Sequence, residues 1–471
     1  MGTWRRSTSA LARGTRRAHA RGRSALCAAL AACALLAPGT APAWSGHALC
    51  TWQALAPLTE LSPKRVRAET LEQFLAAQAP QLERVLAAHE AWARATLEYY
   101  APRPDGLAFK APPPGVNADL RNDFLKALRL NVASRLPLFR QLRPGEDAGA
   151  AAALPWAEVT PLRSGRGASA NRYVRLAAGD EVAVADVVAT ASAEPDYGLD
   201  LGLFEDNGTA QGKLYGFGTQ PFGNAALDFS SQAPFHMGFH HEARLVFAAA
   251  GFLRRTQPDA RIALFSALAR HALATGHDYW GWRFTGWALH YVQDLTQPYH
   301  ARVLPGVGAA RMIGVNTLAI VGVDTPKLQA ITRVSNRHTA LENYQFRRMV
   351  LAYEQGRSDD ALLAALRDTR QDREHWVYAP ADTRSQVSRE AAEAADALDA
   401  QLERSLPARY VVDTDVNLGT EASDALDFHA IARAHSEAEH GRLEQQVAAR
   451  LVRMGLHSRA LVRAMVAAPP K

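Results

Sequence analysis

The chain has 471 residues and a formal net charge of +6, but this charge is unevenly distributed. Residues 1–43 hold seven arginines and no acidic residue, so without them the formal charge falls from +6 by seven, to −1. The rest of the chain therefore lacks the overall positive charge typical of nucleic-acid-binding proteins. Cys50 is the only cysteine after residue 43, which excludes an intramolecular disulfide there.

The first 43 residues have the pattern of a secretory signal peptide. A basic stretch is followed by an apolar run, Ala25 to Leu36, and by the small-residue motif Ala41-Pro-Ala43. Cleavage after this motif would make Trp44 the first residue of a secreted or periplasmic protein. Two alternatives stay open: a twin-arginine signal at Arg5-Arg6 and a lipoprotein motif at Leu30-Ala-Ala-Cys33. After signal removal we expect no transmembrane segment, because no apolar run of about 18 residues follows.

Helical periodicity dominates residues 44–471 and predicts a single all-α domain. Apolar residues recur at helical spacing at Leu71, Phe74, Leu75 and Leu82. The predicted helices cover about 68–99, 119–137, 241–254, 258–275, 280–297, 328–355, 358–370, 386–405, 424–450 and 452–467. Residues from about 100 to 235 are rich in proline, glycine and alanine. They are predicted to form a loop-rich insertion in the helical body, with a pair of short strands around 172–187.

One short segment concentrates side chains that bind metals: His290-Tyr-Val-Gln-Asp294-Leu-Thr-Gln-Pro298-Tyr-His300. His290 and Asp294 are four residues apart, so their side chains share one face of a helix. Pro298 ends or bends that helix because it has no N–H group. His300 is then free to reach a neighbouring ion.

A second pair with the same spacing strengthens the prediction of a metal site. His338 and Glu342 lie four residues apart in the helix predicted for 328–355. One such pair alone is often only a hydrogen bond, but two pairs and a further histidine make five ligand-type side chains. Imidazole and carboxylate groups together favour zinc.

These motifs resemble one family. Trp44 after the cleavage motif, His290-x3-Asp294-x5-His300 and His338-x3-Glu342-Asn343 resemble the bacterial zinc-dependent phospholipase C and S1/P1 nuclease superfamily. The resemblance is strong over residues 290–345 and 44–47 and weaker over 190–242. It does not cover most of 100–185 or the C-terminal third. It implies a multi-helix phospholipase C/P1 nuclease-like bundle, a trinuclear zinc site and phosphodiester hydrolysis by a zinc-activated water.

The resemblance also implies how three zinc ions would be bound. The first would be held by Asp196, His236, His290 and Asp294. The second would be held by His47, the other oxygen of Asp294, and the freed α-amino group and carbonyl of Trp44. The third would be held by His300, His338 and Glu342. Asp196 is also the candidate catalytic residue, which would orient or deprotonate the attacking water.

Two of these ligands have rivals nearby in the sequence. Asp196 is preferred to Glu194 and Asp200 because a tyrosine follows the corresponding aspartate in phospholipases C. His236 is preferred to His240 because of its place just upstream of the helices that lead to the central motif. His271 and His277 are predicted to be packing or solvated residues. His429, His435 and His440 lie in a charged segment and are predicted to face solvent.

The substrate is predicted less directly. The glutamate of the His338-x3-Glu342-Asn343 motif resembles phospholipases C, whereas the nucleases usually carry aspartate at that position. The near-neutral charge after residue 43 also favours a phospholipid over a polynucleotide. However, His47 stands where choline-preferring phospholipases C carry an acidic residue. Tyr197 and Phe235 are candidates for an aromatic cage around a quaternary ammonium group, or for core packing.

The sequence therefore predicts a zinc-dependent, phospholipase C-like hydrolase that acts on a phospholipid or another phosphodiester. The first alternative is an S1/P1-type single-strand nuclease, for which nucleic acid would be the substrate. The second is a non-catalytic surface module that zinc stabilises. His300, His338 and Glu342 argue against such a module, because a zinc ion with three protein ligands keeps one coordination position open.

Overall fold

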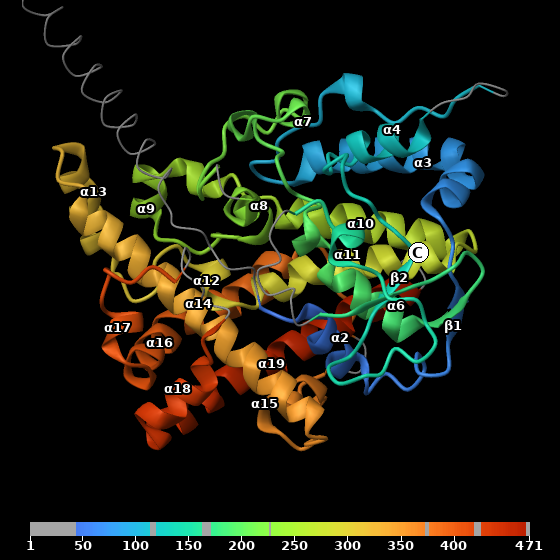
Figure 1. The fold of residues 1–471 in the computed structure, drawn as a ribbon. Helices are drawn as coiled ribbons and strands as arrows, with labels where there is room; N and C mark the ends of the chain where they lie inside the picture. The colour runs from blue at the N-terminus through green and yellow to red at the C-terminus, as the bar shows by residue number, and fades with distance from the viewer. Residues whose placement is uncertain are drawn as a thin grey trace, which may run out of the picture.

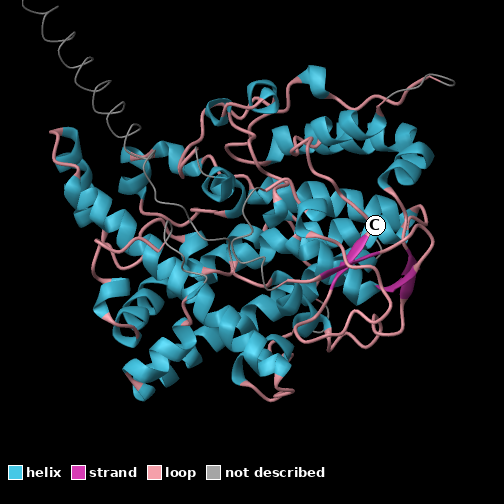
Figure 2. Ribbon diagram, viewed as in Figure 1, coloured by secondary structure: helices cyan, strands magenta, loops and turns pink. Residues whose placement is uncertain are grey.

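The protein is mostly helical, with only two short antiparallel strand pairs among its described residues (Figure 2). The computed structural model describes residues 44–113, 119–162, 171–225, 228–372, 376–418 and 425–467. The predicted signal peptide, residues 1–43, lies outside them. The predicted all-α class is confirmed. None of the described helices combines the length and the apolar character that a bilayer crossing requires.

The centre of the fold is helix α11, Asp278–Leu295, which is buried along its whole length after its first residue. It packs against α10 (Pro258–Ala274), α6 (Val184–Ala193) and α19 (Glu437–Val466). Figure 1 shows α11 in the middle of the molecule, with α3 (Leu71–Thr96) and α4 (Leu120–Ala127) above it. A helix surrounded by protein keeps charged side chains only if they are paired or bind a ligand.

The close approach of α6 to α11 depends on Gly286. A Cβ atom at this position would lie 2.5 Å from the Cβ of Ala191 and 2.6 Å from the carbonyl oxygen of Val188. A larger residue would push α6 away from the helix that carries the central motif.

The chain turns after α11 as the proline predicts. Helix α11 ends at Leu295, and Pro298 is the first residue of the short helix α12, Pro298–Ala301. The N–H group of Gly238 donates to the carbonyl oxygen of His300 at 2.8 Å, which ties α12 to the chain that follows α8, Asp228–His236. The second motif lies in α14, Thr325–Glu354.

Helix α2, His47–Leu55, was not predicted from the sequence. It begins after Gly46, whose φ of 82° lies in the left-handed region that favours glycine. A Cβ atom there would also lie 2.8 Å from the ring of Phe346. Helix α2 packs against α6, α15 (Ala361–Arg367) and α19, which brings His47 to the centre of the fold.

The prediction of a loop-rich insertion at 100–235 is only partly right. This region contains α6, eight of whose ten residues are buried, and α6 packs against both α2 and α11. The predicted strand pair around 172–187 is wrong. Strands β3 (Tyr173–Arg175) and β4 (Glu181–Ala183) do not pair with each other. Instead β3 pairs with β2 (Phe139–Gln141), and β4 pairs with β1 (Arg65–Arg67).

Two helix boundaries also differ from the prediction. Helix α4 stops at Ala127 rather than near 137, and Arg129 and Leu136 have positive φ angles that a helix cannot include. The C-terminal segment forms α18 (Phe428–His435) and one long helix, α19, rather than two helices meeting near residue 451. The remaining helices among the described residues are α5 (Trp156–Val159), α7 (Ala210–Leu214), α9 (Arg244–Ala249), α13 (Ala309–Ile320), α16 (Arg389–Ser405) and α17 (Ala408–Val411).

Candidate metal centre

The described residues contain three groups of side chains that are close enough to share a metal ion. Within each group the ligand atoms lie within 4.8 Å of one another. The groups are His47, His290 and Asp294; Asp196, His236 and His290; and His300, His338 and Glu342. All eight ligands predicted to act through an imidazole or a carboxylate therefore belong to one of these groups.

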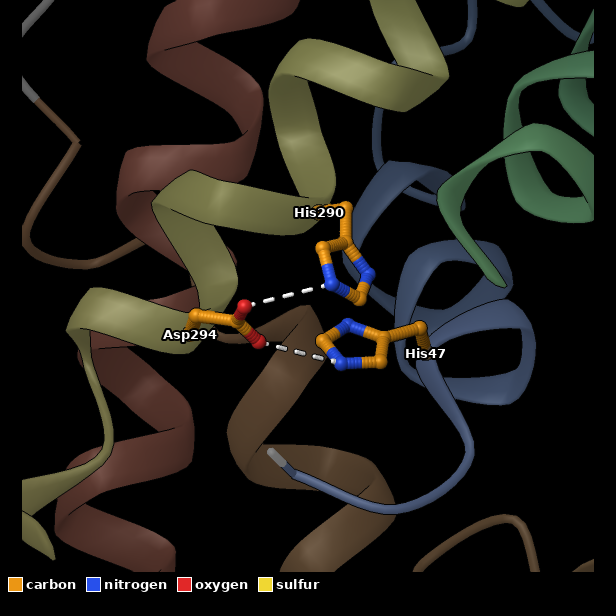
Figure 3. Close-up of side chains that lie close together, drawn as sticks. All are labelled: His47, His290 and Asp294. Atoms are coloured by element: carbon orange, nitrogen blue, oxygen red, sulfur yellow. Dashed lines mark ion pairs between the residues drawn. The ribbon is translucent and has the colours of Figure 1, made fainter. Parts of the chain in front are cut away.

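Asp294 lies between two sets of imidazoles. Its Oδ1 atom is 3.3 Å from Nε2 of His47, and its Oδ2 atom is 2.8 Å from Nδ1 of His236 and 3.2 Å from Nε2 of His290. Figure 3 shows the carboxylate of Asp294 directed at both His290 and His47, which come from α11 and α2. Each oxygen thus faces a different set, as the resemblance implies for a bridging carboxylate.

Asp196 lies near the same imidazoles but belongs to a different segment of the chain. It lies in the short 3-10 helix Pro195–Tyr197, with Oδ2 3.9 Å from Nε2 of His47 and Oδ1 3.8 Å from Nε2 of His290. Its side chain is 18% exposed, whereas the other seven ligand-type residues are buried. Among these eight side chains, Asp196 is therefore the one that solvent reaches.

The structure separates Asp196 from its two rivals. Glu194 is held by Arg283, with Nε 3.0 Å and a terminal nitrogen 2.7 Å from its oxygens. Asp200 accepts a hydrogen bond of 2.6 Å from Arg261 and another of 2.6 Å from the Tyr291 hydroxyl. Both are committed to structural ion pairs or hydrogen bonds, although Asp200 also lies 3.7 Å from Nε2 of His236.

His240, the rival of His236, points elsewhere. Its Nε2 atom is 3.3 Å from Oδ1 of Asp259 on α10. His236 instead has Nδ1 in the cluster and Nε2 turned toward Asp200. Nε2 lies 3.7 Å from Oδ2 of Asp200 and makes no hydrogen bond among the described residues.

Hydrogen bonds fix the direction in which three other imidazoles present their lone pairs. Nδ1 of His290 lies 2.8 Å from the carbonyl oxygen of Ser192, and Nδ1 of His300 lies 2.8 Å from that of His236. Nδ1 of His47 lies 2.8 Å from Oε1 of Gln293. A carbonyl oxygen only accepts, so Nδ1 carries the proton and the Nε2 lone pair of each ring faces the cluster.

The buried atoms at the centre of the cluster lack hydrogen-bond partners among the described residues. They are Nε2 of His47, His300 and His338, Oδ1 of Asp294 and Oε2 of Glu342. Nε2 of His338 lies 2.6 Å from Oε1 of Glu342, but the two atoms do not have the geometry of a hydrogen bond. Buried polar atoms are nearly always partnered in folded proteins. Cations bound in the ligand groups would satisfy these lone pairs and oxygens, so the donor set fits zinc.

Without a bound cation, the histidines His236 and His47 hold their protons more strongly. These protons then supply the positive charge beside Asp294. Burial alone would lower the pKa of His236, but the Asp294 carboxylate raises it to about 9. The pKa of His47 is also raised, because Asp294 outweighs the effect of burial. Burial would raise the pKa of Asp294, yet the imidazoles around it hold it well below its usual range.

In the third group, burial favours the uncharged form of each side chain. Burial lowers the pKa of His300 to about 4 and that of His338 well below its usual value. Burial, together with the charge of Asp196, holds the pKa of Glu342 well above its usual range. An ionised Glu342 at neutral pH therefore requires a cation beside it.

Trp44 lies beside the cluster, but its predicted role depends on cleavage. Its indole is fully buried, and Nε1 donates to Oγ1 of Thr296 at 3.1 Å. The free α-amino group that would bind zinc exists only after removal of residues 1–43, which lie outside the described part. The α-amino ligand stays a prediction.

The predicted aromatic cage is wrong, because Tyr197 and Phe235 lie in different hydrophobic clusters. The Tyr197 hydroxyl donates to Oε1 of Gln141 at 2.8 Å, and its ring packs against Trp156 with centroids 5.1 Å apart. Phe235 is fully buried, and its ring lies 4.8 Å from the guanidinium carbon of Arg261. Both are core residues.

The other histidines divide into two kinds. His277 pairs with Glu69 at 2.8 Å and contacts Gln78, which also contacts His271, so these two have structural roles as predicted. The prediction that His429 and His440 are solvent-exposed is wrong: both are buried, with ring centroids 5.4 Å apart.

Sequence reasoning missed the groups that support the ligands. Gln293 accepts from His47 through Oε1 and donates through Nε2 to Oγ1 of Thr51 at 2.9 Å. Thr51 in turn lies 2.8 Å from Oγ of Ser192, whose carbonyl oxygen holds His290. Gln293 lies inside the central motif, between His290 and Asp294. This position is the sequence signal that could have identified it as a supporting residue.

Comparison with family models, curated proteins and solved structures gives no match for this chain.

Proposed function

We propose that this protein is a zinc-dependent phosphodiester hydrolase of the phospholipase C type, exported by its signal peptide and folded as a phospholipase C/P1 nuclease-like bundle. The observation that carries the proposal is the buried cluster of unpartnered imidazole and carboxylate atoms around Asp294. Such a concentration of unsatisfied groups is costly unless it serves a function. Three adjacent ligand groups suit a multinuclear site better than an isolated structural zinc.

The residues of the site have different roles in the proposed reaction. Zinc held by these groups supplies Lewis acidity, which stabilises charge on phosphoryl oxygens and lowers the pKa of water toward about 7. Asp196 is the partly exposed carboxylate of the cluster, so it can orient a water molecule and accept its proton. Gln293 and Ser192 keep His47 and His290 in the tautomers that leave Nε2 unprotonated. Burial of the other ligands excludes bulk water from the back of the site.

The choice of substrate rests on the sequence motifs and charge. Glu342 and the formal charge of −1 after residue 43 favour a phospholipid, and single-stranded nucleic acid is the alternative. The absence of a cage formed by Tyr197 and Phe235 removes one argument for a choline headgroup.

One assay separates the candidate functions. Purified protein beginning at Trp44 is incubated with a phosphatidylcholine emulsion and, separately, with single-stranded DNA and RNA, each with added zinc or with a chelator. We expect chelator-sensitive release of phosphocholine from the lipid. Cleavage of nucleic acid alone would favour the S1/P1-type alternative. Neither activity in zinc-loaded protein would favour the non-catalytic module.

Replacing Glu342 by alanine is expected to lower the zinc content of the purified protein by one ion per chain. Glu342 is the only carboxylate of the third group, so His300 and His338 alone would hold zinc weakly. Glu354→Ala is the matched control, because Glu354 is an exposed residue of the same helix. Metal analysis of both variants is the measurement, and an unchanged zinc content in Glu342→Ala would refute this ligand.

Adding one residue before Trp44 is expected to impair both zinc binding and hydrolysis. The extra peptide bond converts the α-amino group into an amide, which is a poor ligand. A chain with one residue added after Lys471 serves as the control. Full activity and full zinc content of the N-terminally extended protein would refute the α-amino ligand.

A further inference from the structure

A small cavity outside the proposed metal centre is lined by three buried arginines. It has a volume of about 30 Å³ and lies between α3, α4, α8 and α10. Arg103, Arg129 and Arg261 line it and are at most 7% exposed. A cavity of this size holds a water molecule or a single-atom ion.

Two of these guanidinium groups have only neutral partners. The guanidinium of Arg103 makes one hydrogen bond, a long one of 3.4 Å to the carbonyl oxygen of Ala127, and its buried Nε has no partner among the described residues. Arg129 donates to the carbonyl oxygens of Ala101 and Tyr215 and to the Tyr100 hydroxyl, at 2.8, 3.3 and 3.0 Å. Arg261 differs, because it pairs with Asp200 at 2.6 Å.

Glu90 is the one acidic residue in the cavity wall, and other groups already use it. Its oxygens accept hydrogen bonds from Arg94 at 2.6 Å, from the Tyr100 hydroxyl at 2.7 Å and from the backbone N–H of Arg103 at 2.9 Å. Arg94 also pairs with Asp105 at 3.2 Å, but no side-chain ion pair with a carboxylate is found for the Arg103 and Arg129 guanidinium groups among the described residues. The cavity wall carries surplus positive charge.

The titration of neighbouring groups agrees with this surplus. Burial lowers the pKa of Arg129 to about 10; Tyr100 and Glu90 oppose this effect, whereas the charges of Arg261 and Arg103 add to it. Burial lowers the pKa of His89, another wall residue, to about 4, with Arg103 and Arg129 again contributing. His89 is therefore neutral at pH 7 and adds no charge.

We propose that this cavity binds a single-atom monovalent anion of the halide class, with chloride as the physiological ion. An unpaired buried charge is far more costly than an unpaired dipole, so a water molecule would satisfy the N–H groups without balancing the charge. The limited space in the cavity, about 30 Å³, favours a single-atom ion over a phosphate or a carboxylate ligand. The site is separate from the proposed metal centre and does not depend on the proposed function.

The test is the thermal unfolding of the purified protein in sodium chloride and in sodium gluconate, at equal pH and ionic strength. Chloride that binds only the folded state raises the unfolding midpoint in a saturable way, by about 2 °C or more at saturation. Arg103→Met should remove the chloride dependence, because it keeps the apolar stem and removes the charge. Arg311→Met, at an exposed residue of α13, is the control and should retain it.

Crystals soaked in bromide give a second, independent measurement on the unmodified protein. We expect an anomalous peak in the cavity, within contact distance of the Arg103 and Arg129 guanidinium groups. If Arg103→Met does not fold, this peak decides the question. Equal midpoints in chloride and gluconate, together with no bromide peak in the cavity, would show that it holds water and overturn the proposal.

Discussion

Replacing Asp294 by asparagine is expected to lower phosphodiester hydrolysis by at least about a hundredfold, since loss of even an outer partner of a ligand costs about 10–100-fold. Asparagine has the same shape but no charge, and its amide nitrogen cannot bind a cation. Both oxygens of Asp294 face imidazoles, so the substitution affects two of the three ligand groups at once. Zinc content should therefore fall by more than a single ion per chain.

The matched control is Asp123→Asn, at an exposed residue of α4. It changes the net charge by the same amount and should leave zinc content and hydrolysis unchanged. Metal analysis and the lipid assay are made on both variants, with circular dichroism to verify folding. An Asp294→Asn protein that keeps its full zinc content and activity would rule out the bridging carboxylate.

Removing zinc is expected to destabilise the protein strongly. Zinc that binds the folded state alone adds about 2.7 kcal/mol to the free energy of unfolding when its concentration is a hundred times its dissociation constant. The metal-free chain must instead bury the unpartnered lone pairs around Asp294 and Glu342. Thermal unfolding with excess zinc and with chelator measures the difference.

The stabilisation by zinc should increase with pH. In the metal-free fold the pKa of His236 is raised to about 9 from a usual value of 6.5, so its proton stabilises this fold below pH 6.5. That contribution is lost as pH rises through about 9. Zinc must displace the same proton, so its apparent affinity grows over the same range, by about tenfold per pH unit for one proton. The difference between the zinc and chelator midpoints should widen from pH 6.5 to pH 9; a constant or narrowing difference would contradict this account.

The sequence predicted the parts of the site that depend on local spacing. The central helix was expected at 280–297 and is found at Asp278–Leu295, because its pattern and Pro298 are local signals. The two pairs with i,i+4 spacing also have ligand atoms close together, at 3.2 Å for His290 and Asp294 and 2.6 Å for His338 and Glu342.

Features that depend on distant contacts were not predictable in the same way. The segment Val184–Ala193 was expected to lie in a loop-rich region because the chain around it is rich in glycine and alanine. It is instead a helix buried on nearly all sides, for which helical periodicity gives no signal. Its Ser192 reaches His290, 98 residues away in the chain.

Sequence adjacency was also a poor guide to shared function. Tyr197 follows Asp196 directly, yet its ring lies in the core while the carboxylate faces the imidazoles. Neighbouring residues in a tight helical turn point in different directions. His440 lies among charged residues in the sequence but faces Tyr344, with ring centroids 5.8 Å apart.

Diffraction at the zinc absorption edge, from crystals of the protein beginning at Trp44 and grown with zinc, tests the central proposal most directly. The proposal predicts anomalous peaks within bonding distance of the three ligand groups. One peak is expected beside Oδ1 of Asp294 and another beside Oδ2. Crystals that contain zinc but show no anomalous peak among these eight side chains would contradict it.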